Sequence, residues 1–403
     1  MTSPPPAPPH PVVPETEGEA EGDEKSEKSE GAEDEDGDDS QADEESDDES
    51  TAGDAEWTIG FVEPAPASDL ARQFFPSKVG GRPAWLHPVD VPTAAQLKCL
   101  YTREPLDFLM QVYAPVDDEP SAFHRALYVF VSPHGGDLHR PGAVRVFRSQ
   151  LPRCNPFYPD EPAERGGPLQ ELSDAQQAAY DARGDRWADR RTDVGAQVRK
   201  PRTFAENELV VEPEEFDDEE GEALLRGAKE LGKEEAKAIL ADAAEGQLPE
   251  GLREKGADVT GKDMRVLERM QDKNQVQLSR FHLRLRRSDP EQVVRYCFDE
   301  GAKPLWPSVS DAPEHTDKTV PPCPRCGAAR RFEFQVLPQI INHLNVDSEL
   351  ASAVDFGSIA VYTCGASCAL GGLEGDGAVG VGAGGLSEAY AEEVALVHPP
   401  LNA

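Results

Sequence analysis

Four cysteines in this chain have the residue type and the spacing of metal ligands. Cys323 and Cys326 form a Cys-x2-Cys pair, and Cys364 and Cys368 form a Cys-x3-Cys pair further on. A structural zinc ion takes four thiolate or imidazole ligands at tetrahedral angles, and a Cys-x2-Cys turn supplies two of them. Four cysteines leave no open coordination position, so such a site holds structure and performs no chemistry. We predict a structural zinc ion here; the alternative is four free thiols that never meet.

A similar segment lies earlier in the chain. Cys99 precedes Gln111 by twelve residues, as Cys323 precedes Gln335, and each segment runs from a cysteine turn into an expected strand that ends in Gln-Val. We interpret the chain as a duplicated β unit that has kept one zinc site and largely lost the other, and we expect the two units to pack together.

The earlier segment lacks most of the ligands. Thr102 and Ser132 stand where the second and third cysteines of the later segment stand. Cys99, His134 and His139 could form a reduced metal site with a borrowed fourth ligand. Two histidines in a loop rich in glycine and proline are more often simply exposed, so both interpretations stay open.

The remaining cysteines do not form a disulfide pattern. Cys297 lies in an apolar run and is expected to be a small core residue, and Cys154 stays unassigned. Because no secretory signal is recognisable, we expect a reducing compartment, the cytoplasm, with the nucleus as a further location.

The elements that must position these residues are mainly strands. The predicted fold class is α+β, predominantly antiparallel β, because short runs of apolar and aromatic residues are separated by proline, glycine and aspartate. Strands are expected at residues 106–116, 126–132, 144–151, 208–212, 332–336, 359–363 and 393–397.

Helices are expected in the second half, and composition divides the chain. Residues 221–245 favour an exposed helix or spacer, and apolar residues at helical spacing predict an amphipathic helix within 261–287. Residues 160–200 show no sustained period and are expected to be a loop. The expected organisation is a disordered tail (1–56), an N-terminal β unit (57–159), a mobile insertion and helical linker (160–257) and a C-terminal β domain (258–403).

The charge is very uneven. The formal net charge is −37, and residues 15–56 hold 22 acidic and 2 basic residues, which is 20 of those 37 charges. That segment has too few apolar residues to fold and should be solvated. A surface this acidic repels phosphates and suits a basic partner, so direct DNA binding is not expected. No window is long and apolar enough to span a bilayer.

Enzymatic signatures are missing from the sequence. No serine elbow or other nucleophile–base motif is recognisable, and the glycine-rich run at 377–385 lacks the lysine of a phosphate loop. We expect a protein that is not an enzyme.

Seven motifs in order resemble the programmed cell death protein 2 family. The motifs are Phe74 to Leu86 (FFPSKVGGRPAWL), Phe108 to Pro115 (FLMQVYAP), Phe123 to Phe130 (FHRALYVF), Val144 to Arg153 (VRVFRSQLPR), Pro290 to Tyr296 (PEQVVRY), Pro322 to Pro338 (PCPRCGAARRFEFQVLP) and Val361 to Cys368 (VYTCGASC).

The resemblance implies a function. Family members look like dedicated chaperones that capture a newly made basic ribosomal protein, universal small-subunit protein five (eukaryotic ribosomal protein two), for small-subunit assembly and rRNA maturation. The longer members have a MYND-type zinc finger after the QLPR motif, but residues 169–200 contain no cysteine. The chain therefore looks like the finger-less "like" branch, which is similar to the fungal protein for accumulation of twenty-S ribosomal RNA. We expect a monomer when no client is bound.

A second hypothesis is a zinc ribbon that binds RNA or serves as an adaptor. Its local support is the arginine-rich run at 280–287 together with Arg330 and Arg331 beside the cysteine turn. Phe123, His124 and Arg125 could be surface contacts for a partner, although a packed aromatic residue and a His–Arg pair are the more ordinary interpretation.

Overall fold

The computed structural model describes residues 56–161, 163–164, 167–168, 170–182, 201–215, 273–346, 353–371 and 386–401. All of them belong to one compact unit within residues 50–403. The predicted acidic tail, apart from Glu56, and the predicted helix at 221–245 lie outside the described residues.

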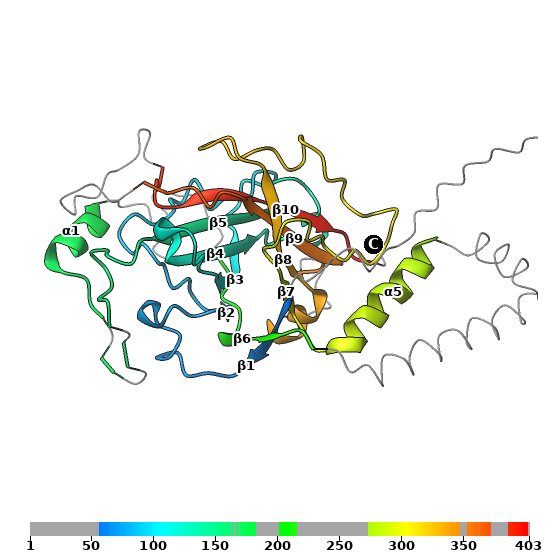
Figure 1. Cartoon of the computed structure of the whole chain (residues 1–403), viewed down its shortest axis with the longest axis horizontal. Helices are drawn as coiled ribbons and strands as arrows, with labels where there is room; N and C mark the ends of the chain where they lie inside the picture. The colour runs from blue at the N-terminus through cyan, green and yellow to red at the C-terminus, as the bar shows by residue number, and fades with distance from the viewer. Residues whose placement is uncertain are drawn as a thin grey trace, which may run out of the picture. The chain divides into compact units, whose positions relative to one another are not determined.

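The described strands form a closed antiparallel barrel (Figure 1). In chain order they are β1 (Thr58–Glu63), β2 (Lys78–Val79), β3 (Asp107–Tyr113), β4 (His124–Val131), β5 (Val144–Leu151), β6 (Asn207–Pro213), β7 (Val294–Tyr296), β8 (Arg330–Val336), β9 (Ser358–Cys364) and β10 (Ala391–His398). Around the barrel the order is β1, β6, β2, β3, β4, β5, β10, β9, β8 and β7, which pairs again with β1. All seven strands expected from the sequence are confirmed, and β1, β2 and β7 are additional.

Strands from the two halves of the chain form two separate runs around the barrel. One run consists of β3, β4 and β5, and the short strand β2 pairs with β3. The other consists of β8, β9 and β10, and the short strand β7 pairs with β8. The two runs meet where β5 pairs with β10 and where β6 pairs with β1. The barrel is therefore one body to which both halves contribute.

The two runs contain the same irregularity. The register of β3 with β4 skips Leu109, and the register of β8 with β9 skips Glu333. Two residues after each skip, a buried glutamine ties down a neighbouring loop. Gln111 Oε1 accepts a hydrogen bond from Ala84 N (2.8 Å), and Gln335 Oε1 accepts one from Leu305 N (2.9 Å).

The helices lie outside the barrel strands. They are α1 (Asp174–Ala182), α5 (Lys273–Ser288) and the short 3-10 turns η1 (Arg72–Phe74), η2 (Pro120–Ala122), η3 (Gly135–Asp137) and η4 (Pro338–His343). Helix α5 occupies the described part of the helix predicted at 261–287, and it packs through Phe281 and Leu285 against Leu337. No described helix is long and apolar enough to cross a membrane.

Helix α1 corrects the expectation of a loop throughout 160–200. A capping box starts it: Ser173 N donates to Gln176 Oε1 (3.0 Å), and Gln176 N donates to Ser173 Oγ (3.3 Å). Reciprocal bonds of this kind satisfy the free amides of the first turn. The Ser-x-x-Gln spacing is a sequence signal for this helix start, whereas the apolar residues of the segment show no helical period.

The largest hydrophobic cluster takes side chains from both halves. Leu109, Val129 and Val146 from β3–β5 pack in it with Phe334 and Val361 from β8 and β9. Two further clusters form around Phe130 and around Phe332, and each also receives a side chain from the other half, Tyr390 in the first and Trp57 in the second. Since the main core is shared, neither half can bury its apolar face alone.

Candidate metal centre

The first cysteine pair lies in a tight turn before β8. Cys323 N donates to Ala328 O (2.8 Å), and Gly327 N donates to Cys323 O (2.8 Å). Gly327 has a φ of +77°, a left-handed conformation that glycine adopts without a steric penalty. The turn places the Cys323 and Cys326 side chains on the same side.

The second pair comes from the neighbouring strand. Cys364 is the last residue of β9 and lies opposite Arg330, the first residue of β8. Gly365 N donates to Ala329 O (3.0 Å), and Ser367 N donates to Cys364 O (2.9 Å), so the chain turns back beside the first pair. Strand pairing therefore brings the two cysteine pairs together.

The four thiol sulfurs, all in the reduced form, lie within 4.8 Å of one another. Cys323 Sγ is 3.8 Å from Cys368 Sγ, and Cys326 Sγ is 3.5 Å from Cys364 Sγ. A zinc–sulfur bond of about 2.3 Å at tetrahedral angles implies sulfurs about 3.8 Å apart. The four cysteines predicted as ligands thus come together in an arrangement that fits one metal ion.

The thiols differ in how readily they ionise. Burial raises the pKa of Cys364, and burial raises the pKa of Cys368 to about 12 although nearby Arg148 lowers it. Burial would also raise the pKa of Cys323, but hydrogen bonds from the backbone amides of Arg325 and Cys326 lower it to about 7. Four thiolates this close repel one another, so a divalent cation is what would let all four exist together.

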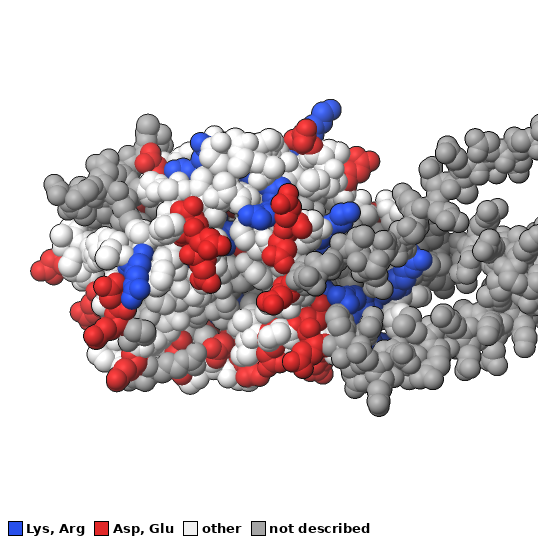
Figure 2. All heavy atoms as spheres, viewed as in Figure 1, with Lys and Arg blue, Asp and Glu red and all other residues white. Residues whose placement is uncertain are grey.

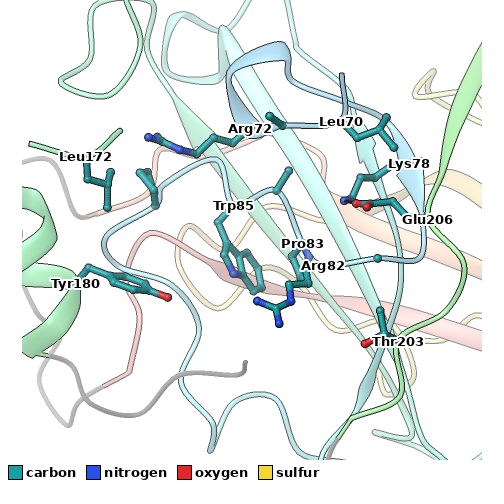
Figure 3. Close-up of a pocket in the computed structure, with 14 residues that line it drawn as sticks. Leu70, Arg72, Lys78, Arg82, Pro83, Trp85, Leu172, Tyr180, Thr203 and Glu206 are labelled. Carbon is teal, nitrogen blue, oxygen red and sulfur yellow. Dashed lines mark hydrogen bonds and ion pairs between the residues drawn. The ribbon is translucent and has the colours of Figure 1, made fainter. Parts of the chain in front are cut away.

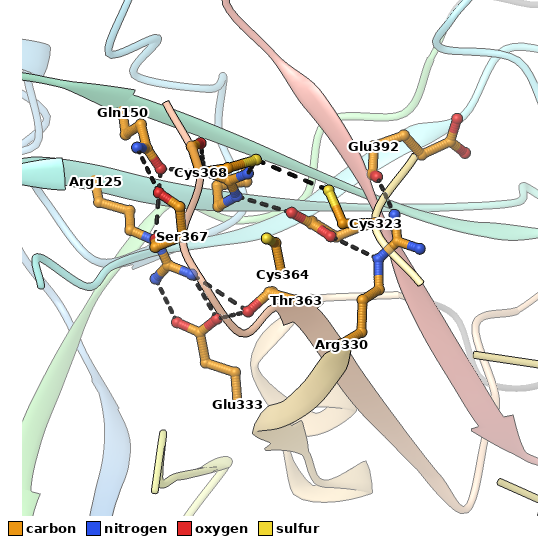
Figure 4. A network of polar contacts seen from close by, with 12 residues as sticks. Arg125, Gln150, Cys323, Arg330, Glu333, Thr363, Cys364, Ser367, Cys368 and Glu392 are labelled. Carbon is orange, nitrogen blue, oxygen red and sulfur yellow. Dashed lines mark hydrogen bonds and ion pairs between the residues drawn. The ribbon is translucent and has the colours of Figure 1, made fainter. Parts of the chain in front are cut away.

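Buried arginines surround the cysteines (Figure 4). Arg330 Nη1 donates to Pro321 O (2.7 Å), and Arg330 Nη2 donates to Glu392 O (3.0 Å), which ties the first cysteine turn to β10. Glu393 accepts from Arg330 Nε (2.8 Å) and from Arg148 Nε (2.8 Å), and the three side chains are at most 4% exposed. The carboxylate therefore links β5, β8 and β10 beside the metal ligands.

A second buried ion pair lies across the barrel from β4 to β8. Arg125 Nη1 donates to Glu333 Oε1 (2.5 Å) and Nη2 to Glu333 Oε2 (2.7 Å), and neither side chain is exposed. Tyr296 and Thr363 also donate to this carboxylate. These pairs were not predicted, although charged residues inside apolar strands are a signal that buried partners are needed.

The expected His–Arg pair is wrong, because successive strand residues point to opposite faces. His124 instead stacks on Phe75, with ring centres 4.1 Å apart, and its Nδ1 is 3.0 Å from the Tyr113 hydroxyl. The expected packing of Phe123 is also wrong: that ring is 43% exposed and stacks under Arg153.

The earlier cysteine turn has the same backbone but no ligand set. Cys99 N donates to Glu104 O (2.8 Å), and Arg103 N donates to Cys99 O (2.9 Å), with Arg103 at a φ of +64°. His134 Nε2 bonds Glu104 (2.9 Å) and His139 is exposed. Among the described residues, only the four C-terminal cysteines form a group able to hold a metal ion.

Comparison with known proteins places the chain in a family. Family models for the N-terminal and C-terminal domains of programmed cell death protein 2 match residues 56–165 and 275–397. Programmed cell death protein 2 of Rattus norvegicus is 35% identical over 344 residues, which are 78% of this chain and 92% of the rat protein. The chain belongs to the programmed cell death protein 2 family.

Other family members are similar over comparable lengths. The Bos taurus programmed cell death protein 2 is 34% identical over 360 residues, which are 80% of this chain and 94% of the bovine protein. The programmed cell death protein 2-like protein of Mus musculus is 27% identical over 327 residues, 72% of this chain and 85% of that protein. These identities do not place the chain with the "like" relatives. No solved structure matches the chain.

This family member also has a pocket of about 570 Å³ beside β2 (Figure 3). Trp85 lies in its middle, with Arg82 and Pro83 from the same loop and Tyr180 from α1 opposite. Lys78 and Glu206 form an ion pair in its wall. Burial lowers the pKa of Lys78, although Glu206 opposes that shift. Arg72 and Arg82 also line the pocket.

Proposed function

We propose that this chain is a non-catalytic escort of a newly made basic ribosomal protein, universal small-subunit protein five, in small-subunit biogenesis. The observation that supports it is membership of the programmed cell death protein 2 family over 78% of the chain, together with a net charge of −37. An unassembled ribosomal protein is basic, so carboxylates can occupy the places that rRNA phosphates take later.

The described surface offers acidic groups for such a client. Glu63 on β1 lies directly opposite Glu208 on β6, and Glu212 follows on the same face of β6. Figure 2 shows acidic side chains gathered along the lower rim of the molecule, where Figure 1 places β1 and β6.

The closed barrel bears on how a client would dock. In a closed sheet every strand has a neighbour on each side. The described strands therefore offer no free edge strand to which a client segment could add. We therefore place the client on an outer face of the barrel, with the protein a monomer until the client binds.

Affinity purification from the protein's own cells tests the escort function. We expect one basic ribosomal protein in stoichiometric amount, resistant to ribonuclease and released by rising salt. A broad mixture, or RNA that vanishes with ribonuclease, would contradict the proposal. Cell fractionation in the same experiment would locate the complex, which we propose to be cytoplasmic and also nuclear.

The RNA-binding ribbon is the weaker candidate. Of the arginines that support it, Arg330 is buried and bonded to Glu393, Arg284 pairs with Glu214, and Arg331 donates to Gly365 O. Side chains engaged in this way have few donors left for phosphates.

We further propose that the four-cysteine group holds one structural zinc ion. The support is the sulfur geometry and the thiolate chemistry of the ligands. Metal analysis of the purified protein should find one zinc per chain. Cys326→Ser should lose that zinc, whereas Cys154→Ser, at an exposed cysteine outside the group, should retain it. Full zinc content in Cys326→Ser would contradict the site.

The finer organisation of the fold is part of this proposal. We propose that the barrel arose from two related β units. The equivalent skips at Leu109 and Glu333, the equivalent glutamine bonds, and the two cysteine turns with left-handed Arg103 and Gly327 support it. In this view the C-terminal unit kept its metal ligands and the N-terminal unit lost them.

A further inference from the structure

One arginine from the N-terminal half reaches the candidate metal centre. Arg148 lies in β5, 220 residues before Cys368, and its side chain has no exposed surface. Its Nη1 donates to Cys368 O (3.0 Å) and its Nη2 to Cys368 Sγ (3.7 Å). The guanidinium thus contacts a ligand atom and the backbone of the same ligand.

The neighbouring side chains hold this arginine in place. Its Nε donates to Glu393 Oε1 (2.8 Å), and its Nη1 also donates to Gln150. Gln150 in turn donates through Nε2 to Ser367 O (2.9 Å), within the turn that presents Cys368. Strand β5 therefore fixes the second cysteine turn through two adjacent side chains.

The local charges are unbalanced without a metal ion. Arg148 and Arg330 share the single carboxylate of Glu393, and all three are buried. This leaves one buried positive charge in excess, which is costly in a protein interior. A divalent cation with four thiolates has a net charge of about −2, so the occupied centre would offset that excess.

We infer that Arg148 is a positioning residue of the metal centre, which holds Cys368 in ligating position and balances the charge of the metal–thiolate group from the other half of the barrel. This inference rests on the proposed zinc site. Side chains that hydrogen-bond to metal ligands typically raise metal affinity 10- to 100-fold.

The test compares zinc affinity and Co²⁺ spectra of the full-length protein and its variants. Arg148→Met should bind zinc about 10- to 100-fold more weakly than the parent, measured by competition with a chromophoric chelator. Its Co²⁺ complex should have an altered thiolate-to-metal charge-transfer band. Arg148→Lys keeps the positive charge but loses the planar guanidinium. Its zinc affinity should lie between that of the parent and that of Arg148→Met.

Arg125→Lys and Arg125→Met are the matched controls. Arg125 is an equally buried arginine on the adjacent strand, paired with Glu333, and none of its hydrogen bonds goes to a cysteine. These variants should lose stability and keep the parent's zinc affinity and Co²⁺ spectrum.

The outcomes separate the inference from the zinc proposal. A parent protein that binds no metal would overturn both. A parent that binds zinc, with Arg148→Lys matching Arg125→Lys in affinity and spectrum, would overturn the role of Arg148 alone. Should Arg148→Met fail to fold, the Lys pair still decides the question.

Discussion

At the scale of single residues, buried charges distinguish this barrel from an ordinary apolar one. Glu333 lies where β8 skips a residue, and Leu109 occupies the corresponding place in β3. Both are fully buried, one in an ion pair and the other in the hydrophobic core. The same backbone irregularity thus accepts a carboxylate or an apolar side chain, provided that the carboxylate has a cation opposite it.

Glu333→Gln should destabilise the protein by about 3–5 kcal/mol, because Arg125 would remain buried without its counter-charge. Equilibrium urea denaturation measures this loss. The double variant Arg125→Met, Glu333→Leu removes both charges and should be more stable than Glu333→Gln. A double variant at least as unstable as the single one would show that the ion pair itself stabilises the fold.

His124 should make stability depend on pH. Burial lowers the pKa of His124, so the unfolded chain, with a histidine pKa of about 6.5, takes up a proton before the folded one does. Stability should therefore be retained above that value and fall as the pH drops below it. The urea midpoint of His124→Gln should fall less between pH 7.5 and 5.5 than that of the parent. His139→Gln, at an exposed histidine, controls for the loss of an imidazole. If the urea midpoint of His124→Gln fell as much as that of the parent, the assignment to His124 would be refuted.

At the scale of elements, short apolar and aromatic runs between turn-forming residues were enough to predict β3–β5 and β8–β10. Cysteine spacing was enough to predict which four residues meet. Neither could show that the barrel closes, because the pairs β1 with β6 and β5 with β10 join strands that are 144 or more residues apart in sequence. Strand β2 has two residues and β7 has three, too few for a periodic pattern. The arginines around the cysteines became visible only once strand register placed Arg148 beside Cys368.

The two cysteine turns allow a paired prediction at this scale. Gly327→Ala should destabilise by about 1 kcal/mol, because φ of +77° is unfavourable for alanine although a Cβ there would meet no atom within 4 Å. Arg103→Gly should leave stability unchanged or raise it by up to about 1 kcal/mol, since Arg103 already has a φ of +64°. Thermal unfolding with metal held constant measures both. A destabilised Arg103→Gly would mean that its side chain contributes more than the backbone strain costs.

At the scale of the whole molecule, the barrel makes the two halves interdependent. Each half supplies one wall of the main hydrophobic cluster, and ion pairs from Arg125 to Glu333 and from Arg148 to Glu393 cross between the halves. Removing either half would expose the apolar inner face of the other and leave these charges unpaired. The metal centre lies next to the β5–β10 junction, so its occupancy should influence both halves.

The halves should therefore unfold in one cooperative transition. Trp85 packs on Tyr128 and Phe130 of the N-terminal half and on Tyr390, whereas Trp306 packs on His398 of the C-terminal half, so the two tryptophans report mainly on different halves. Two variants would each retain one of these two tryptophans and carry phenylalanine at the other tryptophan positions. In each variant, the urea midpoint from tryptophan fluorescence should equal the urea midpoint from far-UV circular dichroism. A Trp306 signal that changes well apart from that of Trp85 would mean that each half is stable by itself, and the shared core would then contribute less than its burial implies.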